Sequence, residues 1–373
     1  MTAKLLKVLT GINRTAAPSS GSTVLVHDLY AAMPEVHTTF LGRSPVDQAW
    51  KTAFDQLIIL STTKRPHGPD FDTYVDVLTR EVSALIDQTQ PDAIHAQHLG
   101  FALSVAFTRA AGTIPIIAIA HGSDVMAAER STRDCEFLIE VAAGSAAIVA
   151  PTHALADRID CLTGRRFTER LTVIPWGIPL RNARAHDRPR LGAGPLSLVH
   201  AGRLDANKAT LTAVEAIAVA AQPHRLTIIG SGPEEEALRE RTRSLGIQDR
   251  VVFMPFMPRQ ELWQRLPHFD AFVFTTSGSE AFGLVVIEAQ AHGLPVVHSN
   301  VAGMTATLGK AGTPFTAGDP TSLASALDQL ARDVHGRAAL IRAGMDNSSQ
   351  YDIVRTAREL TDVTTKTVSA GLT

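Results

Sequence analysis

The chain has 373 residues, which is enough for two hydrophobic cores, because single domains usually stop growing at roughly 250 residues. Charged residues make up 19% of the sequence and hydrophobic residues 45%, and a formal net charge of -2 gives no reason to expect a nucleic-acid partner. The two cysteines, Cys135 and Cys161, cannot form a disulfide framework or a zinc site by themselves, and we expect packed thiols.

We expect no secretory signal at the N-terminus. The segment Met1 to Arg14 lacks a secretory h-region, and its KLLKVLT run is typical of a first strand. No apolar run reaches the roughly 18 residues that a membrane span needs. We therefore expect a cytoplasmic protein without a transmembrane segment.

Short apolar segments alternate with helical periodicity in two successive blocks. In the first block the expected strands are Leu5–Thr10, Ala93–Gln97, Ile114–Ala120, Ala146–Ala150 and Leu171–Ile174. In the second block they are Leu196–His200, Leu226–Ile229, Val251–Met254, Ala271–Thr275 and Val296–Ser299. One amphipathic helix is marked by apolar residues at i, i+3 and i+4 spacing: Tyr74, Val77, Leu78, Val82, Leu85 and Ile86. Alternation of this kind predicts doubly wound α/β domains.

A stretch rich in Pro, Gly and charge separates the two blocks and has the composition of a hinge. It begins with Pro175-Trp-Gly-Ile-Pro179. We therefore expect one domain at residues 1–178, a linker at 179–194, a second domain at 195–348 and a last helical stretch at 349–373.

The segment Thr275 to Ser299 is the most informative part of the chain, because it joins a buried strand, a turn, a helix and a second strand. Small residues in the turn, among them Ser279, let the backbone approach a ligand, and the first helix amides favour an anion. Glu280 lies in the loop and Glu288 about a turn and a half into the helix, so we expect them to hold different hydroxyl groups of one ligand. An ordinary βαβ unit is the alternative interpretation.

This segment resembles the donor site of the retaining GT-B fold glycosyltransferases, especially glycosyltransferase family 4, whose signature is Glu, seven residues and Glu around a Phe-Gly-Leu turn. The resemblance implies two Rossmann-like domains facing a cleft, with the C-terminal helix crossing back to the N-terminal domain. Glu288 would hold the ribose of the nucleotide. The transferred sugar would be held by the first acid and the turn after it: Glu280, Ala281, which replaces the family's usual Gly, Phe282, Gly283 and Leu284.

Two cations follow the strand Leu196–His200, in the segment Ala201-Gly-Arg-Leu-Asp-Ala-Asn-Lys208. Arg203 can neutralise a diphosphate through a fork of donors and Lys208 as a point charge. The family uses the same Gly-Arg-Leu pattern, which contains Gly202 here, and the same Lys for the nucleotide diphosphate. Isolated cations at a helix start are common, but the position after a strand favours the functional interpretation.

The segment Gly230-Ser-Gly-Pro imitates a dinucleotide fingerprint, but Glu235 stands where a third Gly is needed. In the family this loop, with Gly232 here, lies beside the nucleotide base. The loop after the following strand meets uracil, which implies a base contact for Phe256.

Histidines end two strands of the first block. His121 precedes a Gly at the carboxyl end of a strand, so we expect it to face the cleft, and the family carries a His here that touches the donor sugar. His98 and Asp124 are candidates for the acceptor side, with packing an equal alternative for His98. For His95, inside its strand, packing is favoured. The three histidines lack a carboxylate at a defined ligand spacing, so we expect no metal.

Two further motifs carry less weight. Gly21, in the loop before a helix, could approach the donor's phosphate, although the family's usual Gly-Gly is Ser20-Gly21 here. Asp70 and Asp72 imitate a metal-binding Asp-x-Asp but directly precede the amphipathic helix, where Asp is the expected N-cap.

The motifs and the resemblance together predict a metal-independent retaining glycosyltransferase that needs no cofactor. It would move a hexose or N-acetylhexosamine, with N-acetylglucosamine as the first choice, from a UDP-sugar to a hydroxyl of a small-molecule or saccharide acceptor. The lack of a basic amphipathic surface helix argues against a lipid acceptor. A GT-B fold sugar-nucleotide epimerase and a non-catalytic sugar-nucleotide-binding protein are the alternatives.

Overall fold

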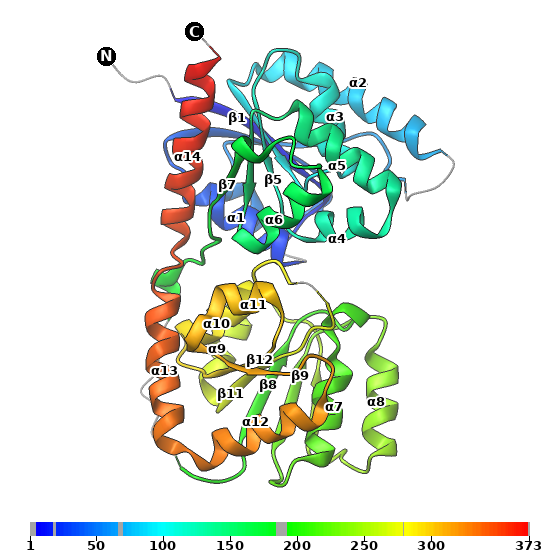
Figure 1. The fold of residues 1–373 in the computed structure, drawn as a ribbon. Helices are drawn as coiled ribbons and strands as arrows, with labels where there is room; N and C mark the ends of the chain where they lie inside the picture. The colour runs from blue at the N-terminus through cyan, green and yellow to red at the C-terminus, as the bar shows by residue number, and fades with distance from the viewer. Residues whose placement is uncertain (1–4, 18–19, 66–69, 184–191, 279, 372–373) are drawn as a thin grey trace. The chain divides into compact units, whose positions relative to one another are not determined.

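The computed structural model describes residues 5–17, 20–65, 70–183, 192–278 and 280–371. It divides into two compact units, one formed by Met1–Gly177 with Ile353–Thr373 and the other by Ile178–Asp352. Each unit is an α/β structure in which helices cover a parallel sheet (Figure 1). The predicted class of two doubly wound α/β units is thereby confirmed.

The first unit has a sheet in the order β3-β2-β1-β4-β5-β6-β7. Its strands are β1 (Leu6–Ala16), β2 (Val36–Val46), β3 (Gln56–Ile59), β4 (Ala93–Gln97), β5 (Ile116–Ile119), β6 (Ala147–Ala150) and β7 (Leu171–Val173). The helices around it are α1 (Gly21–Ala31), α2 (Phe71–Thr89), α3 (Ala102–Ala110), α4 (Ser123–Arg130), α5 (Thr132–Gly144), α6 (His153–Leu162) and α14 (Ile353–Ala370). The strand order reverses between β1 and β4, where sheets of this kind bind ligands.

The second unit repeats this plan in the order β10-β9-β8-β11-β12-β13. Its strands are β8 (Ser197–Ala201), β9 (Arg225–Ile229), β10 (Val251–Met254), β11 (Ala271–Phe274), β12 (Val296–Ser299) and β13 (Thr313–Phe315). Its helices are α7 (Thr210–Val219), α8 (Glu235–Ser244), α9 (Arg259–Arg265), α10 (Leu284–Ala291), α11 (Ala302–Leu308), α12 (Pro320–Arg332) and α13 (Val334–Ser348). Here the order reverses between β8 and β11, so the loops after these two strands meet at the switch point.

Burial explains why these segments become strands and helices. Every residue of β4, β5 and β6 is buried, as strands covered on both faces require. Helix α2 buries Tyr74, Leu78, Val82 and Ile86 of the predicted apolar stripe, whereas Leu85 is half-buried and Val77 is exposed. Asp70 stands at the N-cap position of α2, as expected, but its side chain makes no capping hydrogen bond, and Asp72 forms an ion pair with Arg133.

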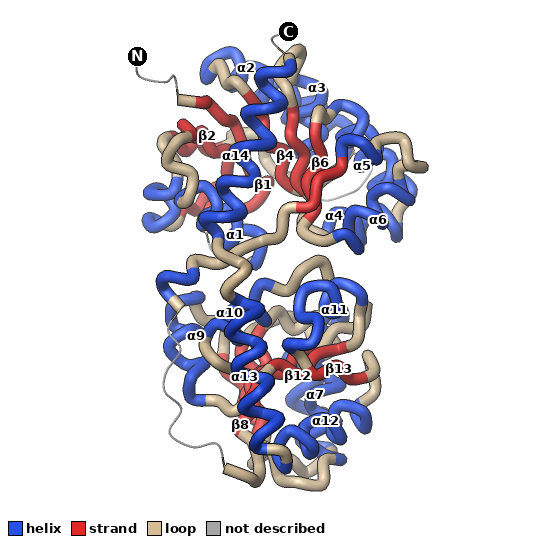
Figure 2. The backbone as a smooth tube through the Cα atoms, turned by 60° about the vertical axis from the view of Figure 1, so that its left-hand side comes forward, coloured by secondary structure: helices blue, strands red, loops and turns tan. Residues whose placement is uncertain are grey.

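Helix α14 returns to the first unit after the chain has completed the second. The hydroxyl of Thr356 donates to the carbonyl of Pro175 over 2.8 Å, and α14 lies against α1 (Figure 2). The return begins at Ile353, slightly after the expected start at residue 349. Of the expected linker 179–194, a short helical turn at Leu180–Asn182 belongs to the second unit, and residues 184–191 lie outside the described residues.

Three strands have no counterpart in the sequence expectations: β2, β3 and β13. The expectation of packed cysteines is wrong for Cys161, which is exposed, while Cys135 is half-buried. No helix of the described residues is long and apolar enough to cross a membrane.

Candidate active site

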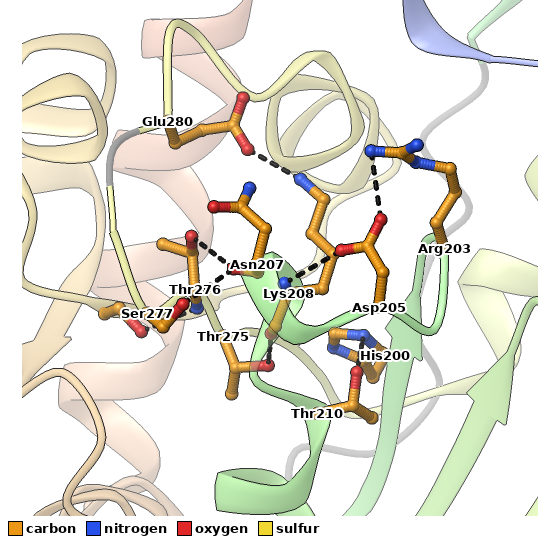
Figure 3. Close-up of polar contacts among 11 residues, drawn as sticks. His200, Arg203, Asp205, Asn207, Lys208, Thr210, Thr275, Thr276, Ser277 and Glu280 are labelled. Atoms are coloured by element: carbon orange, nitrogen blue, oxygen red, sulfur yellow. Dashed lines mark hydrogen bonds and ion pairs between the residues drawn. The ribbon is translucent and has the colours of Figure 1, made fainter. Parts of the chain in front are cut away.

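The loops after β8 and β11 are joined by hydrogen bonds at the switch point of the second unit. The hydroxyl of Thr275 donates to the carbonyl of Lys208 over 2.7 Å, and that of Thr276 donates to the carbonyl of Asn207 over 2.9 Å. The amide of Ser277 also donates to Asn207, over 3.0 Å. Figure 3 shows this seam beneath the charged side chains. The two loops therefore form one surface.

Lys208 and Glu280 form an ion pair across this seam. Nζ of Lys208 lies 2.6 Å from Oε2 of Glu280 and 5.0 Å from the centroid of the Phe274 ring. Burial would raise the pKa of Glu280, but Lys208 and the backbone amides of Phe282 and Ala281 outweigh it and hold the pKa below its ordinary value. Glu280 is therefore an ionised acceptor with one side already occupied by a cation.

Arg203 extends the same charged group toward solvent. Its Nη2 lies 3.0 Å from Oδ2 of Asp205, and 61% of its side chain is exposed, compared with 18% for Lys208. Asp205 in turn caps the short helical turn Ala206–Lys208 by accepting from the amide of Lys208 over 3.3 Å. Figure 3 shows the Arg203 guanidinium and the Lys208 ammonium on the same side of the loop. A diphosphate could replace the Asp205 carboxylate as the partner of the exposed Arg203 guanidinium.

The turn before α10 approaches its neighbours too closely for larger residues. Gly283 has a φ of +76°, and a Cβ there would lie 2.6 Å from Cε of Met304. Ala281 and Phe282 are buried, and Phe282 packs edge-on against Tyr351 at 5.3 Å between ring centroids. Little of these two side chains reaches the surface, so the backbone amides of the turn are the groups that it offers to a ligand. Leu284 is the first residue of α10 and is half-buried, and Ser279 lies outside the described residues.

Glu288 is buried in α10 and paired with a residue that sequence reasoning missed. Nε of Arg259 donates to Oε1 of Glu288 over 2.9 Å, and the guanidinium lies 4.7 Å from the Trp263 ring. The signal for Arg259 is its place at the first position of a helix, in the connection that follows β10. The structure does not bring Glu288 into the Lys208–Glu280 pair.

The glycines of the Gly-x-Gly-Pro loop have a packing role. A Cβ at Gly230 would lie 1.9 Å from the carbonyl oxygen of Gly202, and one at Gly232 would lie 2.3 Å from that of Leu204. The loops after β8 and β9 therefore pack backbone against backbone. Phe256, predicted beside the base, is 54% exposed.

In the first unit, His121 follows β5. Its Nε2 lies 2.8 Å from Oε1 of Gln97, and its ring stacks on that of His98 at 4.2 Å between centroids. Burial, followed by the charge of Arg14, lowers the pKa of His121 to about 3, so the ring is neutral. Gln97 was also missed; its signal is a polar residue at the end of a fully buried strand.

Two other predicted residues of the first unit, His98 and Asp124, contact His121. Asp124 is 1% exposed, and its carboxylate accepts from the amides of Leu99 and Gly122 over 2.6 and 2.7 Å. Burial outweighs these bonds and raises the pKa of Asp124 to about 6. His98 is 2% exposed and stacks on Phe101. Both side chains are buried within the first unit, and their part in binding an acceptor stays a prediction.

Two remaining predictions concern His95, inside a strand, and Gly21, which was expected in a loop. His95 is fully buried and bonded to Tyr30 and Thr364, which confirms its core interpretation. Gly21 begins α1, whose N-cap Ser20 forms a capping box with Thr23, and a Cβ at Gly21 would meet no atom within 4 Å. The described part of the chain contains no group of three or more His, Cys, Asp or Glu side chains that could hold a metal ion.

Two sequence families match the chain. The family described as Glycosyltransferase Family 4 matches residues 20–182, and that described as Glycosyl transferases group 1 matches residues 195–333. A D-inositol 3-phosphate glycosyltransferase from Frankia alni is 34% identical over 246 residues, which cover 59% of this chain and 58% of that protein. A glycogen synthase from Mycobacterium tuberculosis is 31% identical over 222 residues, covering 57% of this chain and 53% of the synthase. The chain thus spans a little over half the length of these curated relatives.

Solved structures resemble the chain over nearly its whole length. HepE of Anabaena in complex with UDP and glucose has a TM-score of 0.78 at 20% identity, over 96% of this chain and 98% of that one. Sucrose-phosphate synthase of Thermosynechococcus elongatus has a TM-score of 0.81 at 18% identity, over 98% of this chain and 100% of the other. These likenesses establish the fold as GT-B. The two family matches, over residues 20–182 and 195–333, show that the chain belongs to the glycosyltransferases described as Glycosyltransferase Family 4 and Glycosyl transferases group 1.

Proposed function

We propose that the chain is a retaining hexosyltransferase that uses a UDP-sugar, with N-acetylglucosamine as the first choice of transferred sugar. The observation that carries this proposal is the ionised Glu280 held by Lys208 at the switch point, beside the exposed Arg203. This combination offers cations to a diphosphate and a carboxylate to sugar hydroxyls within one surface. The solved HepE complex, whose ligands are UDP and glucose, supports the choice of UDP.

The chemistry of the proposed step needs no metal. The bond between the anomeric carbon and the diphosphate breaks, and the leaving oxygen gains negative charge. Arg203, once its contact with Asp205 is replaced by the diphosphate, Lys208 and the first amides of α10 can stabilise that charge. The acceptor hydroxyl bonds to the anomeric carbon on the face that the diphosphate leaves, and its proton passes to the leaving phosphate. The negative charge of Glu280 is balanced by Lys208, and the carboxylate acts as a ligand of the sugar hydroxyls. The proposed step therefore uses no covalent enzyme intermediate.

A second observation, in the first unit, supports an acceptor with a negative charge. Three cations lie near the carboxyl ends of adjacent strands: Arg14 on β1, Arg43 on β2 and Lys64 after β3. Arg43 is held by Asn13 Oδ1 at 2.6 Å and by the carbonyl of Thr62 at 2.5 Å, both neutral partners. Partial loss of solvent, followed by the charges of Arg14 and Arg43, lowers the pKa of Lys64.

An anionic group on the acceptor would relieve the repulsion among these cations. Phosphate fits the combination of guanidinium and ammonium donors. The relative from Frankia alni is named for D-inositol 3-phosphate, which supports a phosphorylated polyol as the acceptor class.

The test is incubation of the full chain with a panel of UDP-sugars and paired acceptors, each polyol with and without a phosphate, read by mass spectrometry. A product heavier than the acceptor by one sugar, with the anomeric configuration of the donor by NMR, is expected. An isomerised UDP-sugar without transfer would instead establish the epimerase. Binding without any turnover over the whole panel would establish a non-catalytic sugar-nucleotide-binding protein.

A further inference from the structure

A continuous row of polar side chains runs through the core of the first unit from His121 to helix α14. Its members are His121, Gln97, Tyr30, His95 and Thr364, and the last four are each 3% exposed or less. The successive donor-to-acceptor distances are 2.8, 2.9, 2.8 and 2.8 Å. The row ends where the hydroxyl of Thr364 meets the carbonyl of Leu360 at 2.7 Å.

The carbonyl at the end of the row determines the direction of each bond. A carbonyl only accepts, so the single proton of the Thr364 hydroxyl points to Leu360. His95 Nε2 must therefore donate to Thr364. Burial lowers the pKa of His95 to about 3, so its ring is neutral and its Nδ1 carries a lone pair. The hydroxyl of Tyr30 has two acceptors within reach, Nδ1 of His95 at 2.8 Å and the hydroxyl of Thr10 at 3.1 Å. It donates to the nearer Nδ1, whose lone pair would otherwise face the phenol oxygen without a proton between them.

The same reasoning orients the Gln97 amide. Because the Tyr30 proton is used on His95, the Tyr30 oxygen accepts from Nε2 of Gln97. The second proton of Nε2 points to the Thr10 hydroxyl at 3.2 Å, whose own proton points to the carbonyl of His95 at 2.9 Å. Oε1 of Gln97 is thereby left to face His121, and it accepts a proton from Nε2 of that ring. Each donor in the row points toward α14, an arrangement in which hydrogen bonds strengthen one another.

We infer that Gln97 is a positioning residue that holds His121 in the tautomer with its proton on Nε2 and an accepting lone pair on Nδ1. Among the described residues, Nδ1 of His121 makes no hydrogen bond. A ligand at this ring must therefore donate a proton to it, which selects a hydroxyl over an ether, a fluorine or a carboxylate. His121 orients a substrate hydroxyl and does not supply a proton. The inference rests on the proposed function only in taking that ligand to be the sugar substrate.

Helix α14 is part of this hydrogen-bonded row, because it supplies the Leu360 carbonyl that sets which atom donates in each bond. The bond between His95 and Thr364 joins residues 269 positions apart in the chain. A substitution at Thr364 is thus expected to be felt at His121, through side chains alone.

The tautomer can be measured without any substrate, by long-range ¹H–¹⁵N NMR of the full chain labelled with ¹⁵N-histidine. His121 is assigned by its loss in His121→Asn. We expect a protonated Nε2 and an unprotonated Nδ1 that do not titrate between about pH 5 and 8. Gln97→Met keeps the side-chain length and removes the acceptor, so a mixture of the two tautomers is expected. A wild-type ring protonated on Nδ1, or an unchanged tautomer in Gln97→Met, would overturn the inference.

Helix α14 provides a matched pair of variants. Thr364→Val removes the acceptor of His95, whereas Thr361→Val removes a hydroxyl on the same helix that donates only to the carbonyl of Ala357, at 2.9 Å. We expect Thr364→Val, and not Thr361→Val, to shift the His95 and His121 nitrogens, with Thr364→Ser restoring them. Equal effects of both valine variants would indicate general loosening of α14 and would contradict the inference. If Gln97→Met does not fold, the comparison of Thr364→Val with Thr361→Val tests the inference by itself.

Kinetics separate the inference from the proposed function. With a working donor and acceptor, Gln97→Met should lower kcat about ten-fold, the loss of roughly one hydrogen bond, and leave the Kd of UDP unchanged. A loss of kcat with an unaltered His121 tautomer would assign Gln97 a merely structural role. Failure to find any turnover in the wild type would count against the proposed function, while the NMR result would still decide the inference.

Discussion

Lys208 Nζ lies 2.6 Å from Oε2 of Glu280, although the two residues are 72 positions apart in the chain. They meet because β8 and β11 are neighbours at the point where the strand order reverses. The pair therefore joins Lys208, the proposed contact of the diphosphate, to Glu280, the proposed contact of the sugar. Binding of a diphosphate and binding of a sugar would act on the same ion pair.

Stability in acid should depend on Glu280. Its folded pKa is held below the ordinary value of 4.5, so the carboxylate stabilises the fold above that pH and the contribution is lost as the pH falls through the lower folded pKa. In Glu280→Gln, thermal unfolding should depend less steeply on pH below about 4.5 than in the wild type. The control is Glu240→Gln, an exposed acid of α8. Parallel pH curves for Glu280→Gln and the wild type would contradict the ionised pair.

UDP should bind without a metal ion. Arg203, Lys208 and the start of α10 already supply positive charge to a diphosphate. Calorimetric titration with UDP in EDTA is expected to give the same Kd as titration with magnesium. Binding that requires magnesium would show that a metal ion, and not these residues alone, neutralises the diphosphate.

Lys64 should distinguish a phosphorylated acceptor from its neutral counterpart. We expect Lys64→Met to raise KM for the phosphorylated polyol by up to about ten-fold and to leave that for the neutral polyol unchanged, because only the first attracts the cation. The difference should shrink at high salt, since Lys64 is exposed. Lys51→Met, at another exposed lysine of the same unit, is the control. Equal changes in KM for both acceptors would argue against a phosphate contact.

Sequence reasoning identified most of the sheet but missed its polar and short strands. Three expected strands, Ala93–Gln97, Val251–Met254 and Val296–Ser299, coincide with β4, β10 and β12. Strand β2 contains Gly42, Arg43 and Pro45, and β13 has three residues with a central Pro. Such segments carry no apolar run, and the strand identity of β2 follows from its pairing with β1.

The candidate site likewise contains residues that the sequence predicted and residues that it missed. Sequence patterns marked Lys208 and Glu280 as residues for different parts of a ligand, but their pairing depends on which strands become neighbours. The partners Arg259 and Gln97 were missed because each bond depends on where a side chain from another element points. The buried positions of His98 and Asp124 depend on the packing around the carboxyl ends of the strands, which a strand-end position does not reveal.

Ala209 should be a site where glycine stabilises the protein. Its φ is +45°, a left-handed conformation that costs an alanine about 1 to 2 kcal/mol, and glycine avoids this cost. Glycine loses more backbone entropy on folding, so Ala209→Gly should gain up to about 1 kcal/mol in the free energy of unfolding. Ala213→Gly, inside α7, should lose at least about 0.5 to 1 kcal/mol. Urea unfolding of both variants checks this, and destabilisation by Ala209→Gly would contradict the left-handed conformation.

The two acids of the Glu-x7-Glu motif should have separable effects on the nucleotide and on the sugar. Glu288→Gln keeps the shape of a buried side chain that is paired with Arg259 but weakens its hydrogen bonding to ribose hydroxyls, so the Kd of UDP should rise, by roughly ten- to a hundred-fold if a full charged hydrogen bond is lost. Glu280→Gln should leave the Kd of UDP nearly intact and lower kcat, because the partner proposed for Glu280 is the sugar and that bond would matter most as the glycosidic bond breaks. Arg259→Met is the control that shows how much of the Glu288→Gln effect comes from the broken ion pair alone. Calorimetry with UDP and initial rates with the UDP-sugar separate the two constants. If Glu280→Gln weakens UDP as much as Glu288→Gln does, the proposed division of the donor site between sugar and ribose is wrong.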